Sequence, residues 1–329
     1  MQKVLITGAC GFVGTCLTNA LLCDGFQVIG VDNLSRRGSE WNALELTGKR
    51  FSLHRVDLSQ TPKVMQLFSE IGPVDAVFHL AAQVAVTTSY VDRQKDFFDN
   101  ALASFNVIEA VKRYTPEAYC LYSSTNKVYG HIEVWQPVGA EYQLNPYTPY
   151  GVSKAVGDLY FNEYGRQELG LETCVLRQSC IYGHHQFGVE DQGWVAWFAI
   201  ANILRRAITI YGDGTQVRDL LYVDDLVELY RKCFQQRLTG AYPVGGGMEN
   251  AISLNDALDL IEEFTGQAFV NISHSATRPG DQPYFVADLA WTCQTNLDWR
   301  PRTPLYQGMR KMIDWICEHR STIQAVLGN

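Results

Sequence analysis

Three features that would assign this 329-residue chain to other classes of protein are missing from its sequence. It has no run of the roughly 18 apolar residues that a membrane-spanning helix needs, and the apolar segment near its start, Val4–Ile6, is too short for a signal sequence. It has no stripe rich in Lys and Arg, and its net charge of −8 at pH 7 argues against nucleic acid as the main partner. Its nine cysteines include no C-x-x-C pair and are odd in number, which favours reduced thiols in a cytoplasmic protein over a disulfide framework.

The composition and the order of apolar segments predict a large α/β protein. Apolar residues make up 47% of the chain and charged residues 19%, so a sizeable core can form. Short apolar runs alternate with helical periodicity in the first half, which is typical of a doubly wound parallel sheet. The expected strands are Lys3–Thr7, Gln27–Val31, Phe51–Val56, Ala76–His79, Ala118–Ser123 and Glu172–Arg177. The expected helices include Gly11–Asp24, Pro62–Ile71, Asp96–Arg113 and Pro149–Leu169.

The pattern becomes shorter and less regular after about Ile181, with turns at 212–214 and 245–247. We therefore expect residues 1–180 to form a first domain around the sheet and residues 181–329 to form a smaller C-terminal lobe. The boundary is approximate, because later segments can return to the first domain. No Ser/Pro-rich linker separates the two parts, so we expect them to pack tightly.

A glycine-rich turn follows the first expected strand and opens a helix. Gly8 permits a tight turn, Gly11 lets the backbone approach a pyrophosphate, and Gly14 lets the helix pack close to the strand. The helix then starts at Phe12 and Val13, where free N–H groups and a partial positive charge favour phosphates. In this context the turn predicts a Rossmann-type dinucleotide site.

Asp32 lies at the end of the second expected strand, where a carboxylate would bind the ribose hydroxyls of the adenosine half. A carboxylate at this position favours NAD, because it would repel the additional phosphate of NADP. Arg36 and Arg37 lie close enough along the chain to weaken that preference.

Tyr150 and Lys154 lie four residues apart in an expected helix and therefore face the same way. A phenol has a reference pKa near 10. The lysine ammonium and the cationic nicotinamide ring of NAD would both favour phenolate. Lowering the pKa by about 3 units would need about 4 kcal/mol, and Tyr150 would then be a usable base near neutral pH. The spacing alone is also common on solvated helix faces.

The segment YSSTNKVYG, residues 122–130, resembles the active-site strand end of the extended short-chain dehydrogenases/reductases, the family of nucleotide-sugar epimerases and dehydratases. The resemblance extends over the whole chain. It implies that Thr125, at the position of the Ser or Thr that hydrogen-bonds the reacting sugar oxygen, forms a catalytic triad with Tyr150 and Lys154. The further cofactor contacts that it implies are Asn33, Asp57, Leu58, Leu80, Ala81, Ala82, Gln83, Asn100 and Ser123, together with Tyr150 and Lys154.

In the expected second lobe, Arg218 and Arg278 resemble the two arginines that grip the substrate diphosphate in this family. A planar guanidinium suits bidentate binding of phosphate. The other substrate contacts that the resemblance implies are Thr125, Asn126, Lys127 and Gln192. The adjacent pair His184 and His185 would point apart in a strand, and no Cys or Asp cluster supports it, so we expect no metal.

The residues after Thr125 narrow the activity within the family. Dehydratases of this family carry Asp-Glu at the positions of Asn126 and Lys127, which disfavours dehydration here, and most 4-epimerases resemble Ser-Ala at Thr125 and Asn126. The segments around Thr125, Asp191–Val195 and Gly214–Asp219 together resemble the CDP-paratose 2-epimerases, also called CDP-tyvelose epimerases.

We therefore predict an NAD-dependent nucleotide-sugar epimerase that oxidises a sugar carbon to a ketone and reduces it again with the same bound cofactor. The alternatives are a 4-epimerase, a dehydratase or reductase acting on a UDP-, GDP- or dTDP-sugar, and an NAD-binding regulator without turnover. The intact set of Thr125, Tyr150 and Lys154 argues against the regulator. We expect a cytoplasmic homodimer or homotetramer that binds neither nucleic acid nor membranes.

Overall fold

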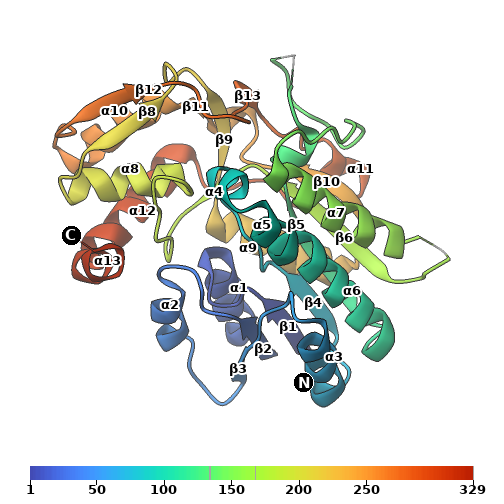
Figure 1. The fold of residues 1–329 in the computed structure, drawn as a ribbon. Helices are drawn as coiled ribbons and strands as arrows, with labels where there is room; N and C mark the ends of the chain where they lie inside the picture. Colours follow the sequence, from blue (N-terminus) through green and yellow to red (C-terminus); the bar gives the residue numbers. More distant parts are fainter. Residues whose placement is uncertain (133–134, 167, 329) are drawn as a thin grey trace.

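A seven-stranded parallel sheet forms the centre of the structure, a computed structural model that describes residues 1–132, 135–166 and 168–328 (Figure 1). The strand order is β10-β6-β5-β4-β1-β2-β3, and every neighbouring pair is parallel. The strands are β1 (Lys3–Thr7), β2 (Gln27–Asp32), β3 (Phe51–Arg55), β4 (Ala76–His79), β5 (Tyr119–Thr125), β6 (Glu172–Gln178) and β10 (Gly240–Val244). The first six agree with the predicted strands to within two residues, so the predicted doubly wound α/β fold is confirmed.

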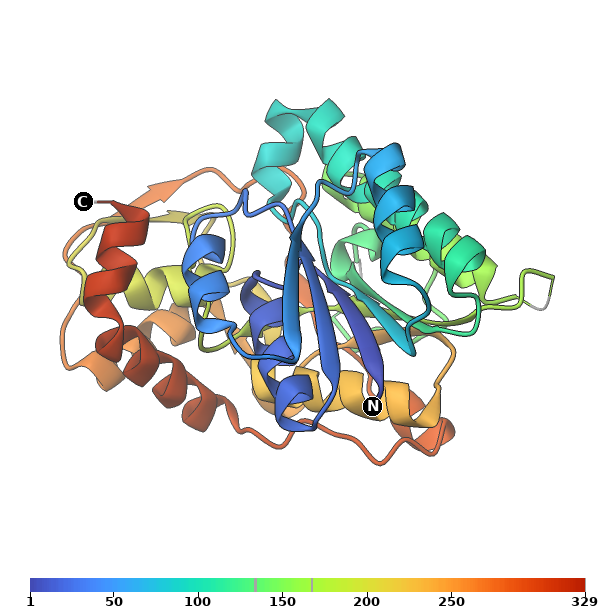
Figure 2. The ribbon, with the colours of Figure 1, turned by 90° about the horizontal axis from the view of Figure 1, so that it is seen from below.

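Helices cover both faces of this sheet, and Figure 2 shows α1 and α9 on the side opposite to α3 and α6. The covering helices are α1 (Phe12–Cys23), α3 (Thr61–Ile71), α6 (Ala103–Tyr114), α7 (Pro149–Tyr164) and α9 (Val223–Gln236). Val4 and Ile6 of β1 pack in the layer of α1 and α9, whereas Leu5 packs in the layer of α3, α6 and α7. Because successive side chains point to opposite faces, a strand that is buried on both faces must be apolar throughout.

Two small sheets and four helices form a second lobe with its own core, in the upper left of Figure 1. At its centre β9 (Val217–Tyr222) pairs with three strands, β7 (Cys180–Tyr182), β11 (Ala251–Ser253) and β13 (Tyr284–Phe285). The second small sheet pairs β8 (Ile208–Tyr211) with β12 (Ile272–Ser275). The helices of the lobe are α8 (Trp194–Ile203), α10 (Leu254–Thr265), α12 (Leu305–Glu318) and α13 (Arg320–Leu327).

Two segments beyond residue 180 belong to the central layers and not to the second lobe. Helix α9 packs against the sheet, and β10 pairs with β6 at its edge. The predicted division of the chain into two domains at residue 180 stays a prediction. Helix α9 and strand β10 follow that residue but pack with the first domain. The shorter elements are α2 (Ser39–Glu45), α4 (Val86–Val91), α11 (Trp291–Gln294) and η3 (Met248–Asn250). Among the described residues, no helix is long and apolar enough to cross a membrane.

Two predicted helices differ from the structure. The segment expected as one helix over 96–113 is built from α5 (Arg93–Phe97), the π-helical turn η1 (Phe98–Leu102) and α6. A π turn shifts the register of the residues that follow it. The helix expected over 149–169 ends at Tyr164, where the N–H of Leu171 donates to the Tyr164 carbonyl over 3.0 Å and directs the chain into β6.

A buried ion pair ties α7 to the strands beneath it. Arg177 of β6 donates from Nε and Nη2 to the two carboxylate oxygens of Asp158, each over 2.9 Å. Ser124 of β5 donates to Oδ2 of the same carboxylate over 2.7 Å. Asp158 is fully buried and Arg177 is 6% exposed. Since α7 also carries Tyr150 and Lys154, this pair sets the position of both predicted catalytic side chains relative to β5.

We expect Arg177→Met to lower the free energy of unfolding by about 3–5 kcal/mol, because it leaves the Asp158 carboxylate buried without a counter-charge. Urea denaturation measures this loss. The matched control is Arg166→Met, which removes the partner of Glu163 in an exposed pair and should cost less than about 1 kcal/mol. Equal effects of the two substitutions would mean that the buried pair does not anchor α7.

Candidate active site

A cleft with a cavity of about 370 Å³ lies at the carboxyl ends of the parallel strands, between the sheet and the second lobe. Its volume falls within the range typical of ligand sites. The predicted site residues that line it are Gly8, Gly11, Phe12, Val13, Gly14, Asp32, Asn33, Asp57, Leu58, Leu80, Ala81, Ala82, Ser123, Thr125, Asn126, Lys127, Tyr150, Lys154 and Gln192. The predicted site residues that the structure does not bring to its wall are Gln83, Asn100, Arg218 and Arg278.

The glycine-rich turn after β1 has the geometry of a phosphate-binding loop. Gly8 has a positive φ of 68°, and a Cβ at Gly14 would lie 2.0 Å from the Gly8 carbonyl oxygen. A side chain at either position would therefore open the turn. The N-cap residue of α1 is Gly11, which has no side chain to cap the helix, so the first N–H groups of α1 are available to a phosphate. The residues present fit the pyrophosphate of a dinucleotide.

The end of β2 forms the adjoining wall. Asp32 accepts the N–H of Cys10 over 3.0 Å and the N–H of Leu34 over 2.8 Å. Burial raises the pKa of Asp32, and these two hydrogen bonds oppose that effect. Arg36 also lines the cleft, and its guanidinium donates to the side-chain oxygen of Gln192 in the second lobe. The sequence contains no signal for this contact, because it joins positions 156 residues apart.

The three predicted catalytic side chains converge on the cleft. Thr148 is the N-cap of helix α7: its hydroxyl accepts the N–H of Gly151 over 2.9 Å and orients the first turn, which carries Tyr150. The Tyr150 phenol lies close enough to Thr125, at the end of β5, for Thr125 to lower its pKa. One turn later, Lys154 donates from Nζ to the Ser123 carbonyl over 2.7 Å.

Burial is the largest influence on the ionisation of this group. Burial raises the pKa of Tyr150 to about 12, and the interaction with Thr125 opposes that shift. Burial also lowers the pKa of Lys154 to about 7, against the charges of Asp158 and Asp96. The expected lowering of the phenol pKa includes the cationic cofactor ring and stays a prediction, since in the protein on its own desolvation outweighs the nearby charges. A phenolate at neutral pH needs a further positive charge in the cleft.

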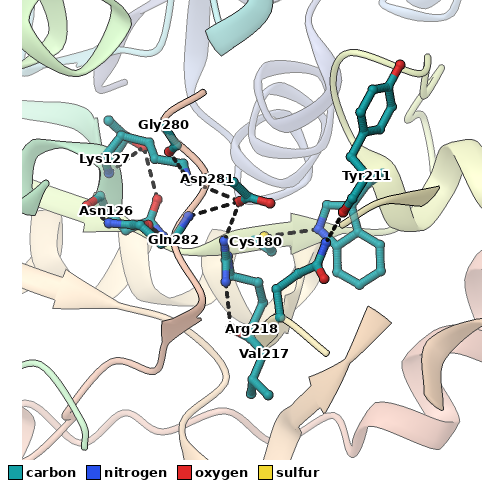
Figure 3. Close-up of polar contacts among 12 residues, drawn as sticks. Asn126, Lys127, Cys180, Tyr211, Val217, Arg218, Gly280, Asp281 and Gln282 are labelled. Carbon is teal, nitrogen blue, oxygen red and sulfur yellow. Dashed lines mark hydrogen bonds and ion pairs between the residues drawn. The ribbon is translucent and has the colours of Figure 1, made fainter. Parts of the chain in front are cut away.

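The two predicted diphosphate-binding arginines are engaged within the second lobe. Arg218 donates from Nη2 to Asp281 over 2.8 Å and from Nη1 to the Val217 carbonyl over 2.7 Å (Figure 3). Arg278 donates to the Glu190 carbonyl over 3.0 Å, and its guanidinium carbon lies 3.9 Å from the centroid of the Tyr211 ring. Their role toward a diphosphate stays a prediction.

A model of the NAD dependent epimerase/dehydratase family matches residues 4–245. The chain belongs to this family. A CDP-paratose 2-epimerase of Salmonella typhi is 37% identical to it over 95% of this chain and 99% of that protein. The structure of the UDP-glucose 4-epimerase of Thermus thermophilus in complex with NAD is 31% identical, with a TM-score of 0.85 over 96% of this chain and 99% of that one. The structure of the UDP-glucuronic acid 4-epimerase of Bacillus cereus in complex with UDP-glucuronic acid and NAD is 28% identical, with a TM-score of 0.85 over 96% and 99% of the two chains.

Membership in this family confirms the resemblance inferred from residues 122–130. It also confirms the predictions of NAD as cofactor and of a nucleotide-sugar epimerase at the level of the family. The roles of the individual site residues rest on the geometry of this chain.

The two adjacent histidines of this family member are engaged separately. His184 pairs through Nε2 with Asp224 over 2.9 Å, whereas His185 Nδ1 lies 3.1 Å from a Glu45 carboxylate oxygen without forming a hydrogen bond. Within the described ranges of the chain, no group of three or more His, Cys, Asp or Glu side chains could hold a metal ion.

His79, at the end of β4, lies behind the phosphate-binding loop, and its hydrogen bonds define its tautomer. The Thr7 hydroxyl accepts the N–H groups of Leu80 and Ala81, over 3.1 and 3.2 Å, and lies 2.7 Å from His79 Nδ1. A hydroxyl oxygen has two acceptor sites, so its proton points to Nδ1. The proton of the neutral ring is then on Nε2, which donates to Ser104 over 3.0 Å.

The same network continues to the catalytic helix and explains the place of Asn100. Ser104 donates to the Asn100 carbonyl over 2.6 Å. The fully buried Asn100 side chain accepts the N–H of Gln83 over 2.8 Å and donates to Ser153 of α7 over 3.0 Å. Ser153 donates to the Tyr150 carbonyl over 3.0 Å. Asn100 thus joins the cofactor side of the cleft to the helix of Tyr150 without lining the cleft itself.

We expect the His79 ring to stay neutral, with its proton on Nε2, across the range in which the enzyme is folded. Burial lowers its pKa to about 3, below the usual value for histidine, so protonation would break the bond from Thr7. Nitrogen-15 chemical shifts of the ring should match the Nε2–H tautomer and should not change between pH 8 and pH 5. Loss of that signal in His79→Gln assigns it. A ring that titrates in this interval, or that carries the proton on Nδ1, would contradict the hydrogen-bond network of Thr7, His79 and Ser104.

Proposed function

We propose that this protein is a 2-epimerase that inverts C2 of a CDP-linked 3,6-dideoxyhexose. The observation that carries the proposal is the convergence of Thr125, Tyr150 and Lys154 on the cleft that also contains the phosphate-binding loop. The similarity to a CDP-paratose 2-epimerase, at 37% identity over nearly the whole of both chains, supports this choice of sugar and nucleotide.

The side chains of the cleft divide the proton chemistry among them. NAD, when bound, supplies the acceptor for the hydride of the sugar carbon and the donor that returns it. Tyr150 takes the proton of the C2 hydroxyl as general base, and Thr125 steadies the same oxygen with a hydrogen bond. The Lys154 ammonium favours the phenolate form of Tyr150. After the ketone has turned its other face to the cofactor, Tyr150 returns the proton to the oxygen.

The residues after Thr125 favour epimerisation over the loss of water. Asn126 donates from its amide nitrogen to Gln282 over 3.2 Å, and Lys127 is a cation, so neither is a carboxyl group that could move protons between sugar carbons. A 4-epimerase is the second candidate, because the two solved 4-epimerases are similar to this chain over almost its whole length. Both candidates use the same three catalytic side chains and differ in the carbon that faces Tyr150.

We also propose that the protein is a homodimer or homotetramer whose contact includes the outer face of α7. Val152, Leu159 and Tyr160 are 47%, 56% and 40% exposed on this helix. The ring centroids of Tyr160 and of Phe105 on α6 lie 5.1 Å apart, so the apolar surface extends over both helices. Exposed apolar surface of this kind is typical of protein interfaces.

A cytoplasmic location is proposed from the cysteines. All nine are free thiols, and five of them are buried among core residues. Reduced cysteines used as small apolar side chains suit a reducing compartment.

Deuterium at C2 of the CDP-sugar should remain at C2 in the inverted product, because the hydrogen is carried by the bound cofactor and does not exchange with water. Product NMR after incubation with a panel of CDP-, UDP-, GDP- and dTDP-sugars identifies the substrate, the inverted carbon and the label. Tyr150→Phe is the control, and it should lower turnover by at least about 100-fold, as expected for loss of a general base, while the protein still retains its cofactor. Inversion at C4 would defeat the 2-epimerase assignment, and loss of the deuterium to solvent would exclude the hydride route.

Leu159→Glu should dissociate the oligomer, because a carboxylate in the contact would have to be desolvated without a partner. Light scattering after size exclusion compares the particle mass with the chain mass of 37.0 kDa. Leu44→Glu is the control, since Leu44 is 72% exposed on α2, outside the proposed contact. A wild-type protein with the mass of one chain would refute the oligomer, and an unchanged mass for Leu159→Glu would place the contact elsewhere.

A further inference from the structure

Lys127 presents hydrogen-bonding capacity to the cleft that the protein itself does not use. It follows Thr125 by two residues in the short helical turn η2 (Asn126–Tyr129), lines the cleft, and has a side chain that is only 17% exposed. Its Nζ lies 3.5 Å from the Gly280 carbonyl and 3.9 Å from Asp281 Oδ1, and no other acceptor in the described part of the chain is within reach. An ammonium has three donors, and at Lys127 none of them makes a short hydrogen bond within the described residues. Lys154, by comparison, donates to the Ser123 carbonyl over 2.7 Å.

The charges around Lys127 do not cancel. Asp281 lies between Lys127 and Arg218, as Figure 3 shows, and its Oδ1 accepts from Arg218 over 2.8 Å and from the N–H of Gln282 over 3.0 Å. One carboxylate therefore faces two cations, and the nearer cation is Arg218. Arg218 is 5% exposed and does not line the cleft. The unpaired positive charge is thus that of Lys127, and a buried cation is stable only with a partner.

We propose that Lys127 donates a charged hydrogen bond to an oxygen of the sugar, and that Asp281, held by Arg218, is the residue that positions it. This inference rests on the proposed function for the identity of the ligand. Lys127 extends from the same turn as Thr125, since its own N–H donates to the Thr125 hydroxyl over 3.3 Å. The sugar that reacts at Thr125 and Tyr150 therefore lies beside it. Lys127 neither gains nor loses a proton in this role. It holds an oxygen that Tyr150 and Thr125 do not hold.

The surroundings of Lys127 make its charge sensitive to pH. Burial and the positive charge of Arg218 on β9 lower its pKa, Asp281 and Cys180 on β7 raise it, and together these effects place it at about 8. As the pH rises through this value the ammonium is lost, so kcat/KM should fall on the alkaline side. Asp281→Asn removes a charge that raises the pKa of Lys127, so the alkaline limb should move to lower pH. Lys127→Arg keeps a permanent charge and should remove this limb, which leaves only the separate titration of Lys154 near pH 7.

Binding and turnover of matched variants test the assignment. Calorimetry with CDP and with CDP-glucose compares the wild type with Lys127→Met and with the exposed control Lys63→Met. We expect Lys127→Met to bind CDP as the wild type does, and to lose at least about 10-fold in affinity for CDP-glucose relative to CDP and in kcat/KM, as expected for a charged hydrogen bond. Lys127→Arg should recover part of the activity without the alkaline limb, which a purely structural role would leave in place.

Equal losses for CDP and CDP-glucose would overturn the inference, because the ammonium would then bind the diphosphate. Unchanged kcat/KM and an unchanged pH profile in Lys127→Met would overturn it as well. Acetylation of Lys127 by acetic anhydride, measured by mass spectrometry with Lys63 as reference, tests the sugar contact without any turnover. It therefore distinguishes a failure of this inference from a failure of the proposed function. Protection of Lys127 by CDP-glucose beyond that by CDP would support the sugar contact even in a wild type that epimerises none of the sugars tested, and equal labelling would oppose it.

Discussion

The site depends on the buried ion pair between Asp158 and Arg177. Tyr150 and Lys154 are on α7, whereas Ser123 and Thr125, their partners, end β5. The pair joins α7 to β6, and Ser124 adds β5 to the same carboxylate. A buried ion pair of this kind contributes little net stability compared with apolar packing, but breaking it is costly because one charge is left alone. It therefore selects one position of α7 over the sheet, which is the position that the catalytic geometry needs.

A second constraint is the low polarity of the cleft. Burial is the largest influence on Tyr150 and Lys154 and moves both toward their neutral forms, so that their pKa values are about 12 and about 7. The phenol is thus a weak acid in the protein by itself, and a cationic cofactor ring would favour the phenolate through a short-range charge in a medium of low dielectric constant. Base strength in this arrangement would appear only when the cofactor is in place, which couples proton transfer to the presence of the hydride acceptor.

The strands could be predicted from the sequence because each is a short apolar run bounded by turn residues, as in Lys3–Thr7 before Gly8. Tyr150 and Lys154 could be paired from their spacing in an expected helix, whereas Thr125 was identified from the resemblance of residues 122–130 to the family. Contacts between distant positions carried no local signal. No hydrophobic periodicity and no motif in the sequence indicates the Arg36–Gln192 contact or the Asp158–Arg177 pair. The π-helical turn at Phe98–Leu102 was missed because its composition is that of an ordinary helix, and it is this turn that carries Asn100 to Gln83 and Ser153.

The chemical type of the two side chains after Thr125 distinguishes an epimerase from a dehydratase better than the fold, which both kinds of enzyme share. Loss of water requires a group that donates a proton to the departing hydroxyl and a group that removes one from the neighbouring carbon. In this chain an amide and an ammonium stand at the two positions after Thr125, and both are tied to the loop 280–282 of the second lobe. The Asn126 amide does not ionise near neutral pH, so it can act neither as an acid nor as a base. The Lys127 ammonium lies near Asp281 and the Gly280 carbonyl, and while it is charged it cannot act as a base. The two side chains after Thr125 therefore favour the proposed route of oxidation, turning and reduction over the loss of water.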